Sequence, residues 1–213
     1  MQYKNCIFDM DGTLVDSMGY WRSLERNFLE QKGVIGPIDD VLELAKPLPL
    51  VKSTALFIER FHLDGTPEQI ADEMMHAMEQ HYLNDIPLKK GALAFLENLK
   101  QQNAKMCVVT ATPRQLVEVC SAHLNLTHYF EFMLSCDEVG VGKDHPAAFF
   151  EAARRLNAVP ADIAVFEDSL QAAQTAKKAG FYTVGVYDKN GADYWDQLSG
   201  LADERIITWN EIT

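Results

Sequence analysis

Five short runs of apolar residues recur along the chain, and none of them alternates with polar residues. They lie at Cys6–Phe8, Met106–Val109, Phe132–Leu134, Ile163–Phe166 and Thr183–Val186. Strands that are apolar on both faces are typical of parallel sheets covered by helices on both sides. The runs therefore predict a buried, mostly parallel sheet.

Helical patterns separate most of these runs. One begins with Thr112-Pro113-Arg114-Gln115, which has the sequence of a Thr cap followed by Pro at the first helical position. The others cover Gly91 to about Gln102, Pro146–Leu156, and Ser169–Ala179 before Gly180. Alternating strands and helices predict an α/β fold with a doubly wound, Rossmann-like sheet.

The interval after the first run breaks this alternation, because residues 17–87 contain no convincing strand. Four helices are expected there, near Met18–Lys32, Ile38–Leu44, Val51–Phe61 and Thr66–Tyr82. The last opens with the capping box Thr66-Pro67-Glu68-Gln69. We therefore predict an α/β core formed by residues 1–15 and 88–213, with a helical domain at 16–87 inserted into it.

Charge and composition narrow the class of partner. The 213 residues carry a formal net charge of -12, which disfavours a nucleic acid polymer. No apolar stretch approaches the length of a membrane span, and the short apolar run near the N-terminus is too short for a signal peptide. The four scattered cysteines are expected to be reduced and buried, which favours a cytoplasmic protein.

Polar and charged residues follow the apolar runs. Because parallel strands present their carboxyl ends at one edge of a sheet, we expect these residues to form one cluster. It comprises Asp9, Asp11, Thr110, Lys143, Glu167 and Asp168. Each residue alone could be a turn, cap or surface residue. Four converging carboxylates, however, repel one another unless a cation lies among them, and oxygen ligands of this kind suit Mg²⁺.

Such a cluster predicts phosphoryl transfer from a small phosphate ester. One carboxylate can attack phosphorus and form an acyl phosphate. A second carboxylate two residues further on can protonate the leaving alkoxide and later accept a proton from water. The metal, a lysine and a hydroxyl offset the charge on the phosphoryl oxygens. Hydrolysis is the expected outcome because water is a competent acceptor.

Four motifs in series resemble those of the haloacid dehalogenase superfamily across nearly the whole chain. The first is Asp9-Met10-Asp11-Gly12-Thr13-Leu14-Val15-Asp16-Ser17, the second is Thr110 after Val108-Val109, the third is Lys143 in Gly142-Lys143-Asp144-His145-Pro146, and the fourth is Glu167-Asp168-Ser169. The helical insertion is similar to the cap of the branch that contains phosphoglycolate phosphatases and β-phosphoglucomutases.

The resemblance implies a role for each motif residue. Asp9 would be the nucleophile and Asp11 the general acid and base. Phosphate would be bound by Thr110, Ala111 and Lys143. Mg²⁺ would be held by the Asp9 carboxylate, the Asp11 backbone carbonyl and Asp168, with Glu167 close by or acting through water. The cap would close over the substrate, with hinges near 15–17 and 86–88.

The chain departs from the family pattern at three positions. Asp144 follows Lys143 where the family usually has Pro, and Ala172 stands where it tends to have Gly. Mutases of this branch tend to carry a His where Trp21 stands, which disfavours a phosphomutase. Asp11, which the dehalogenases of the superfamily lack, favours phosphoryl transfer over carbon–halogen cleavage.

Three functions stay open at this point. We expect a phosphatase, with a phosphomutase of the β-phosphoglucomutase type as the alternative and a non-enzymatic binding role as the least favoured. The expected partner is a small-molecule phosphate ester, and the expected assembly is a monomer or weak homodimer. Substrate choice is assigned to the cap, with candidate residues Tyr20, Trp21, Arg22, Lys46 and Lys52. Core packing of the aromatic residues and solvent exposure of the cations is the simpler explanation of each of them.

Overall fold

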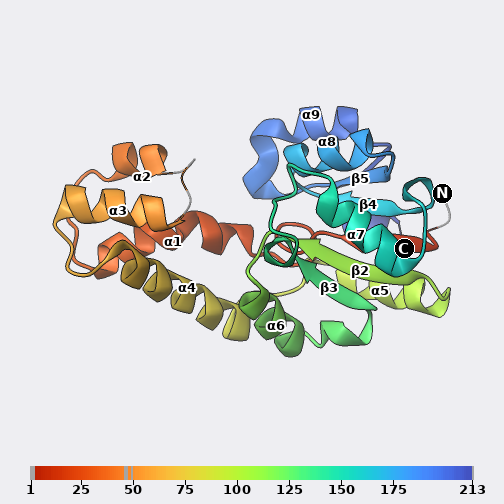
Figure 1. Ribbon diagram of the computed structural model, residues 1–213, viewed down its shortest axis with the longest axis horizontal. Coiled ribbons are helices and arrows are strands. Elements are labelled where there is room, and N and C mark those ends of the chain that lie inside the picture. The colour runs from red at the N-terminus through yellow and green to blue at the C-terminus, as the bar shows by residue number, and fades with distance from the viewer. Residues whose placement is uncertain (1–2, 46–47, 49, 213) are drawn as a thin grey trace. The chain divides into compact units, whose positions relative to one another are not determined.

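The computed structural model describes residues 3–45, 48 and 50–212, and these divide into two compact units (Figure 1). The core unit comprises Met1–Met18 and Ile86–Thr213, and the helical unit comprises Gly19–Asp85. The sequence analysis placed the helical domain at 16–87. Each unit is described separately below.

The core unit contains a parallel sheet of six described strands in the order β3-β2-β1-β4-β5-β6. Their bounds are β1 (Asn5–Phe8), β2 (Lys105–Thr110), β3 (Phe132–Ser135), β4 (Ala164–Glu167), β5 (Tyr182–Val186) and β6 (Glu204–Ile206). The doubly wound α/β prediction is confirmed. Strand β6 escaped prediction because it is a three-residue edge strand in which only Ile206 is buried.

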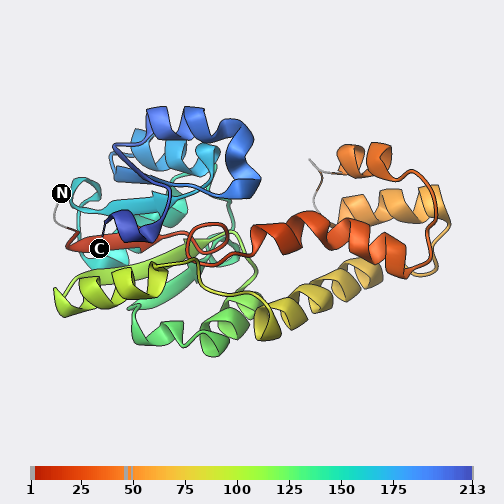
Figure 2. The ribbon, with the colours of Figure 1, turned by 180° about the vertical axis from the view of Figure 1, so that it is seen from behind.

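Helices cover both faces of this sheet (Figures 1 and 2). Helices α5 (Ala92–Gln101) and α6 (Arg114–His123) lie on one face, and α7 (Ala147–Leu156), α8 (Leu170–Lys178) and α9 (Trp195–Leu201) lie on the other. On the α7 and α8 side, Ile7 pairs in register with Cys107 and Val165, and all three belong to one buried cluster. Burial of both faces explains why the strands read as continuous apolar runs.

The helical unit contains most of α1 (Met18–Gln31), together with α2 (Asp39–Ala45), α3 (Leu50–Phe61) and α4 (Pro67–Asn84). The predicted capping box is confirmed, because the Thr66 hydroxyl accepts from the Gln69 amide at 3.3 Å and the Gln69 side chain accepts from the Thr66 amide at 2.9 Å. Apolar side chains that are fully buried between these helices include Phe57, Met74 and Met78. The candidate Lys46 lies outside the described residues.

All four cysteines are buried free thiols. Burial raises the pKa of Cys6 and Cys107 well above the ordinary value of a thiol, which keeps them protonated and unreactive. Within the described part of the chain, no helix is both long and apolar enough to span a membrane.

An aromatic cluster packs Trp209, far along the sequence, against the first strand. The Trp209 ring packs against Phe8, Phe95 and Phe166, with ring centroids 5.1–5.9 Å apart. Its indole N–H donates to the backbone carbonyl of Thr13 at 3.2 Å. Trp209 is only 1% exposed, so this side chain fills the core and supports the loop after β1 at the same time.

We expect Trp209→Ala to lower the free energy of unfolding by about 3–5 kcal/mol, the usual range for truncating a large buried aromatic residue. Trp209→Phe, which keeps most of the ring but loses the N–H donor, should cost less. Urea unfolding followed by circular dichroism measures both. Trp195→Ala is the control, since Trp195 is only half-buried. An equal loss in the Trp195 and Trp209 variants would contradict the supporting role of this cluster.

Candidate active site

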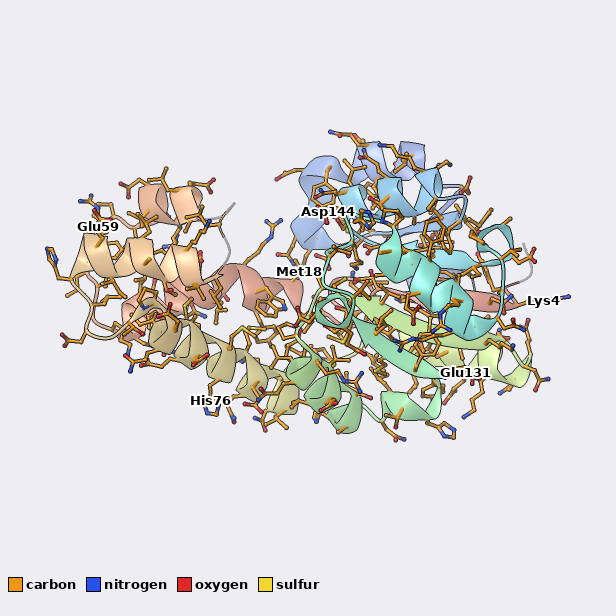
Figure 3. All side chains as sticks on the ribbon, in the orientation of Figure 1. Lys4, Met18, Glu59, His76, Glu131 and Asp144 are labelled. Atoms are coloured by element: carbon orange, nitrogen blue, oxygen red, sulfur yellow. The ribbon has the colours of Figure 1, made fainter. Side chains whose placement is uncertain are left out.

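The carboxyl ends of β1, β2 and β4 open into one pocket of about 440 Å³. Every residue that lines it belongs to the core unit. Figure 3 labels two of them, Met18 and Asp144, at the end of the sheet opposite Lys4 and Glu131. The pocket brings together all the core residues that the motifs singled out, namely Asp9, Asp11, Thr110, Ala111, Lys143, Glu167 and Asp168.

Asp9 follows the last residue of β1 and is 5% exposed. Its backbone N–H donates to the Phe166 carbonyl at 2.9 Å, which fixes the residue against β4. One carboxylate oxygen, Oδ1, accepts from the Lys143 ammonium. The other, Oδ2, is buried and has no hydrogen-bond partner. A buried carboxylate oxygen without a partner is costly, so Asp9 Oδ2 is an available ligand or nucleophile.

Lys143 carries its charge into the middle of the acidic cluster. Its ammonium donates to both Asp9 and Glu167, and its side chain is 10% exposed. The neighbouring Asp144 makes no ion pair with it, although Asp144 replaces the usual Pro of the family. The backbone carbonyl of Asp144 accepts a hydrogen bond from the Thr175 hydroxyl at 3.4 Å.

Asp168 is held by the first motif. The Thr13 hydroxyl donates to Asp168 Oδ1 at 3.2 Å and accepts from the Asp168 amide at 3.1 Å. Gly12 has a φ of +83°, and a Cβ atom at this position would lie 2.3 Å from Asp168 Oδ2. Glycine is therefore required here both by its backbone conformation and by the close approach of this carboxylate.

The electrostatics of the cluster show an excess of buried negative charge. Burial raises the pKa of the Glu167 carboxyl to about 7, although Lys143 acts in the opposite direction. Burial and the Asp9 and Glu167 charges together raise the pKa of Asp168 well above its ordinary value. Burial acts to lower the pKa of Lys143, but the two carboxylates more than offset it and the pKa is raised. One ammonium therefore does not neutralise the cluster.

These observations meet the chemical requirements of a divalent cation. Oxygen atoms of Asp9, Glu167 and Asp168 all lie within 4.8 Å of one another, and all three residues are buried. Asp9 Oδ2 has no hydrogen-bond partner, and the pKa values of the other two carboxyls are raised, first by burial and then by the neighbouring carboxylates. A cation bound among these oxygens would favour their charged forms. A hard cation bound by oxygen ligands fits this donor set.

The Asp11 carboxylate points to two hydroxyl groups. It accepts from Ser17 Oγ at 2.6 Å and from Thr112 Oγ1. The prediction that Thr112 caps a helix is wrong. Helix α6 begins after Pro113, with no side-chain cap, because the Thr112 hydroxyl is used by Asp11. A Thr before Pro has the same local sequence whether its hydroxyl caps the helix or donates to a distant carboxylate. The sequence pattern alone therefore does not distinguish a cap from a contact with Asp11.

Thr110 ends β2 and is 1% exposed. Its hydroxyl oxygen accepts from the Thr112 amide at 3.1 Å, which leaves the hydroxyl hydrogen to be donated elsewhere. Ala111 follows it on the pocket wall and is exposed. The Thr112 carbonyl accepts from Ser135 Oγ at 2.7 Å, so the end of β3 steadies this turn.

Several residues of the pocket are not marked by any pattern in the sequence. Thr13 and Ser17 belong to the first motif, but their contacts with Asp168 and Asp11 were not foreseen. Met18, Gln171 and Tyr194 line the pocket as well. Tyr194 belongs to a 3-10 helix at Lys189–Tyr194, and no pattern in the sequence marks that segment as part of the site.

The candidate specificity residues that the structure describes belong to the helical unit. The Trp21 indole N–H donates to the Tyr82 hydroxyl at 3.0 Å, and the Tyr20 ring packs against His81 with a centroid distance of 4.7 Å. Arg22 and Lys52 are exposed. Their contribution to substrate choice stays a prediction.

Comparison with known proteins agrees with this geometry. The sequence model of a family described as haloacid dehalogenase-like hydrolase matches residues 3–180. Validoxylamine A 7'-phosphate phosphatase of Streptomyces hygroscopicus subsp. limoneus is 30% identical over 195 residues, which cover 90% of this chain and 89% of the relative. Fructose-1-phosphate phosphatase YqaB of Escherichia coli (strain K12) is 29% identical over 187 residues, with 87% and 97% covered.

Solved structures share the fold. A HAD hydrolase, family IA, variant 3, from Entamoeba histolytica superposes with a TM-score of 0.80 at 21% identity, covering 100% of this chain and 96% of its own. A β-phosphoglucomutase from Clostridium difficile superposes with a TM-score of 0.72 at 20% identity, covering 99% and 93%. The resemblance inferred from the four motifs is confirmed by the family match, and the chain belongs to the haloacid dehalogenase-like hydrolase family.

Proposed function

We propose that this chain is a magnesium-dependent phosphatase that hydrolyses a small phosphorylated sugar through a phosphoaspartate at Asp9. The observation that carries the proposal is the state of the Asp9 carboxylate. One of its oxygens is held by Lys143, while the other is buried without a partner in a pocket lined by Asp11 and Thr110. A fixed, partly desolvated carboxylate of this kind is suited to attack phosphorus.

In the proposed reaction Asp9 attacks the phosphorus atom, and the bond to the leaving sugar oxygen breaks. Asp11 gives a proton to that oxygen and later takes one from the water that hydrolyses the phosphoaspartate. Lys143 and Thr110 lie on the same pocket and would bind the phosphoryl oxygens. The Ala111 backbone would contribute to the same binding site.

We assign Asp9, Glu167 and Asp168 as the residues that hold Mg²⁺, together with the Asp11 backbone carbonyl. When bound, the ion supplies positive charge to the phosphoryl oxygens. The residues of the chain hold these carboxylates close together before the ion binds. Thr13 does this for Asp168, and Lys143 does it for Asp9 and Glu167.

Support for a phosphorylated sugar comes from the names of the relatives. One is a fructose-1-phosphate phosphatase, and a relative from Thermotoga maritima, 27% identical over 174 residues, is a phosphorylated carbohydrates phosphatase. A phosphomutase is not favoured, because Trp21 stands where the mutases tend to have His and its indole N–H is used by Tyr82. We further propose that the helical unit acts as a cap, that the protein is cytoplasmic, and that it is a monomer or weak homodimer.

We expect Asp9→Asn to lower the rate of phosphate release by at least about 10³-fold, because the amide cannot form the acyl phosphate. A panel of sugar phosphates and an aryl phosphate, assayed with Mg²⁺, measures this. Asp196→Asn, a change on the exposed surface of α9, is the matched control and should leave the rate unchanged. The proposal fails if the wild-type protein releases phosphate from no ester of the panel.

Asp11→Asn should discriminate between leaving groups. With a sugar phosphate the rate should fall about 10²–10⁴-fold, because the alkoxide leaves unprotonated. With p-nitrophenyl phosphate, whose leaving group needs no proton, the first step should survive. Stopped-flow absorbance should then show a burst of one nitrophenol per enzyme before slow turnover. Equal losses on both substrates, without a burst, would contradict the acid and base role of Asp11.

Stability should depend on pH in opposite ways without and with the metal. The pKa of Glu167 is raised to about 7 in the folded state. As the pH rises, the unfolded state therefore loses the Glu167 proton before the folded state does. The metal-free protein should lose stability between about pH 5 and about pH 7. Mg²⁺ competes with the protons for the same oxygens, so it should raise the melting temperature more at about pH 8 than at about pH 5. Thermal melts in EDTA and in MgCl₂ measure this, with Asp168→Asn as the variant expected to lose the response.

A further inference from the structure

Lys89 lies directly after the second chain connection between the two units, and its side chain is only 15% exposed. Three oxygen atoms surround its ammonium. They are the backbone carbonyl of Gly12, the backbone carbonyl of Tyr187 at 2.8 Å, and Asp188 Oδ2 at 2.9 Å. The ammonium donates hydrogen bonds to the two carbonyls and forms an ion pair with Asp188.

The Lys89 backbone joins the same region. Its N–H donates to the Leu14 carbonyl at 2.8 Å, and the Asp16 N–H donates to the Pro87 carbonyl at 3.0 Å. Val15 and Leu88 form an antiparallel bridge between these two contacts. Segments 14–16 and 87–89 are thus paired with each other, and the Lys89 side chain connects the pair to the residues that follow β5.

Asp188 completes the arrangement. It is 4% exposed, and its Oδ1 accepts from the Asn190 amide at 2.8 Å. Burial alone would raise the pKa of this carboxyl, but Lys89 and the Asn190 donors bring it below its ordinary value. Asp188 is therefore a fixed, charged anchor for the Lys89 ammonium.

The Gly12 peptide is the part of the active-site loop that needs an anchor. Gly12 directly follows Asp11, and glycine has the least restricted backbone of all residues. Its α-carbon also lies so close to Asp168 that a Cβ would meet Oδ2 at 2.3 Å. The carbonyl that Lys89 holds belongs to the peptide between Gly12 and Thr13. A rotation of this peptide would disturb Thr13, whose hydroxyl holds Asp168, and would change the backbone next to Asp11.

We propose that Lys89 is a positioning residue for the first motif. It holds the Gly12 peptide, and through that peptide it keeps Asp11 in the reactive arrangement. The proposal rests on the phosphatase function proposed above. Lys89 does not line the pocket, so its proposed action runs through the Gly12 peptide and not through contact with the substrate. Its effect is expected on the rate of the chemical step, while substrate binding stays close to normal.

The test uses Lys89→Met, which keeps an unbranched side chain of similar length but removes the charge and the donors. With the sugar phosphate that the wild type turns over best, kcat should fall about tenfold to a hundredfold, with KM within about threefold. The melting temperature should fall too, because Asp188 is left buried without its cation. Lys90→Met is the matched control, since Lys90 is the exposed neighbour and should leave kcat and the melting temperature unchanged.

The double variant Lys89→Met/Asp188→Asn separates positioning from stability. It removes the unpaired buried charge, so most of the lost melting temperature should return, whereas kcat should stay low because the Gly12 carbonyl still has no donor. A kcat that recovers together with the melting temperature would overturn the proposal, since Lys89 would then be a structural residue. A kcat in Lys89→Met equal to that of Lys90→Met would overturn it as well.

Hydrogen exchange provides a readout that does not depend on activity. The amides of Gly12, Leu14 and Val15 are hydrogen-bonded within the loop. They should exchange faster in Lys89→Met and in the double variant, but not in Lys90→Met. If the wild type hydrolyses no phosphate ester but these amides exchange faster in Lys89→Met, the anchoring role of Lys89 is supported and the phosphatase function is rejected. Unchanged exchange would reject the anchoring role itself.

Discussion

The Lys143 ammonium lies between Asp9 and Glu167 at the end of a parallel sheet, and the rest of the pocket depends on this contact. Buried carboxylates repel one another, and each loses the stabilisation that water gives to its charge. One cation shared by two of them keeps the cluster compact enough for a third, Asp168, to approach. The fold thus maintains an incompletely neutralised site, which favours the binding of a divalent cation.

The parallel sheet itself places the residues that make this contact, and no additional structural element is needed. Parallel strands that are buried on both faces all end at one edge, so residues far apart in the sequence arrive together without any direct connection. The support is also distant in the sequence. Thr13 holds Asp168, Ser135 steadies the turn at Thr112, and Trp209 donates to the carbonyl of Thr13. The reactive groups are few, but the residues that fix them come from every part of the core unit.

Much of this was predictable because two strong signals coincide. The apolar runs mark strands β1 to β5. Polar or charged residues at the ends of β1, β2 and β4, together with Lys143 from the loop beyond β3, meet in the pocket. The parts that escaped prediction have physical reasons. Thr112 has the sequence of a cap but bonds to Asp11, and Tyr194 reaches the pocket from a 3-10 helix that lacks periodicity. Strand β6 is too short and too exposed to give an apolar pattern. Long-range contacts such as that of Lys89 with Gly12 leave no local pattern at all.

The bond from Trp209 to Thr13 joins residues 196 positions apart. A ribosome makes Thr13 long before Trp209, so the loop that carries the two aspartates lacks this support until residue 209 has been made. Strand β1 also waits for β4 on one side, since they are neighbours in the sheet. The nascent chain is therefore expected to be catalytically silent until residue 209 has left the ribosome, and activity should begin only after this contact has formed.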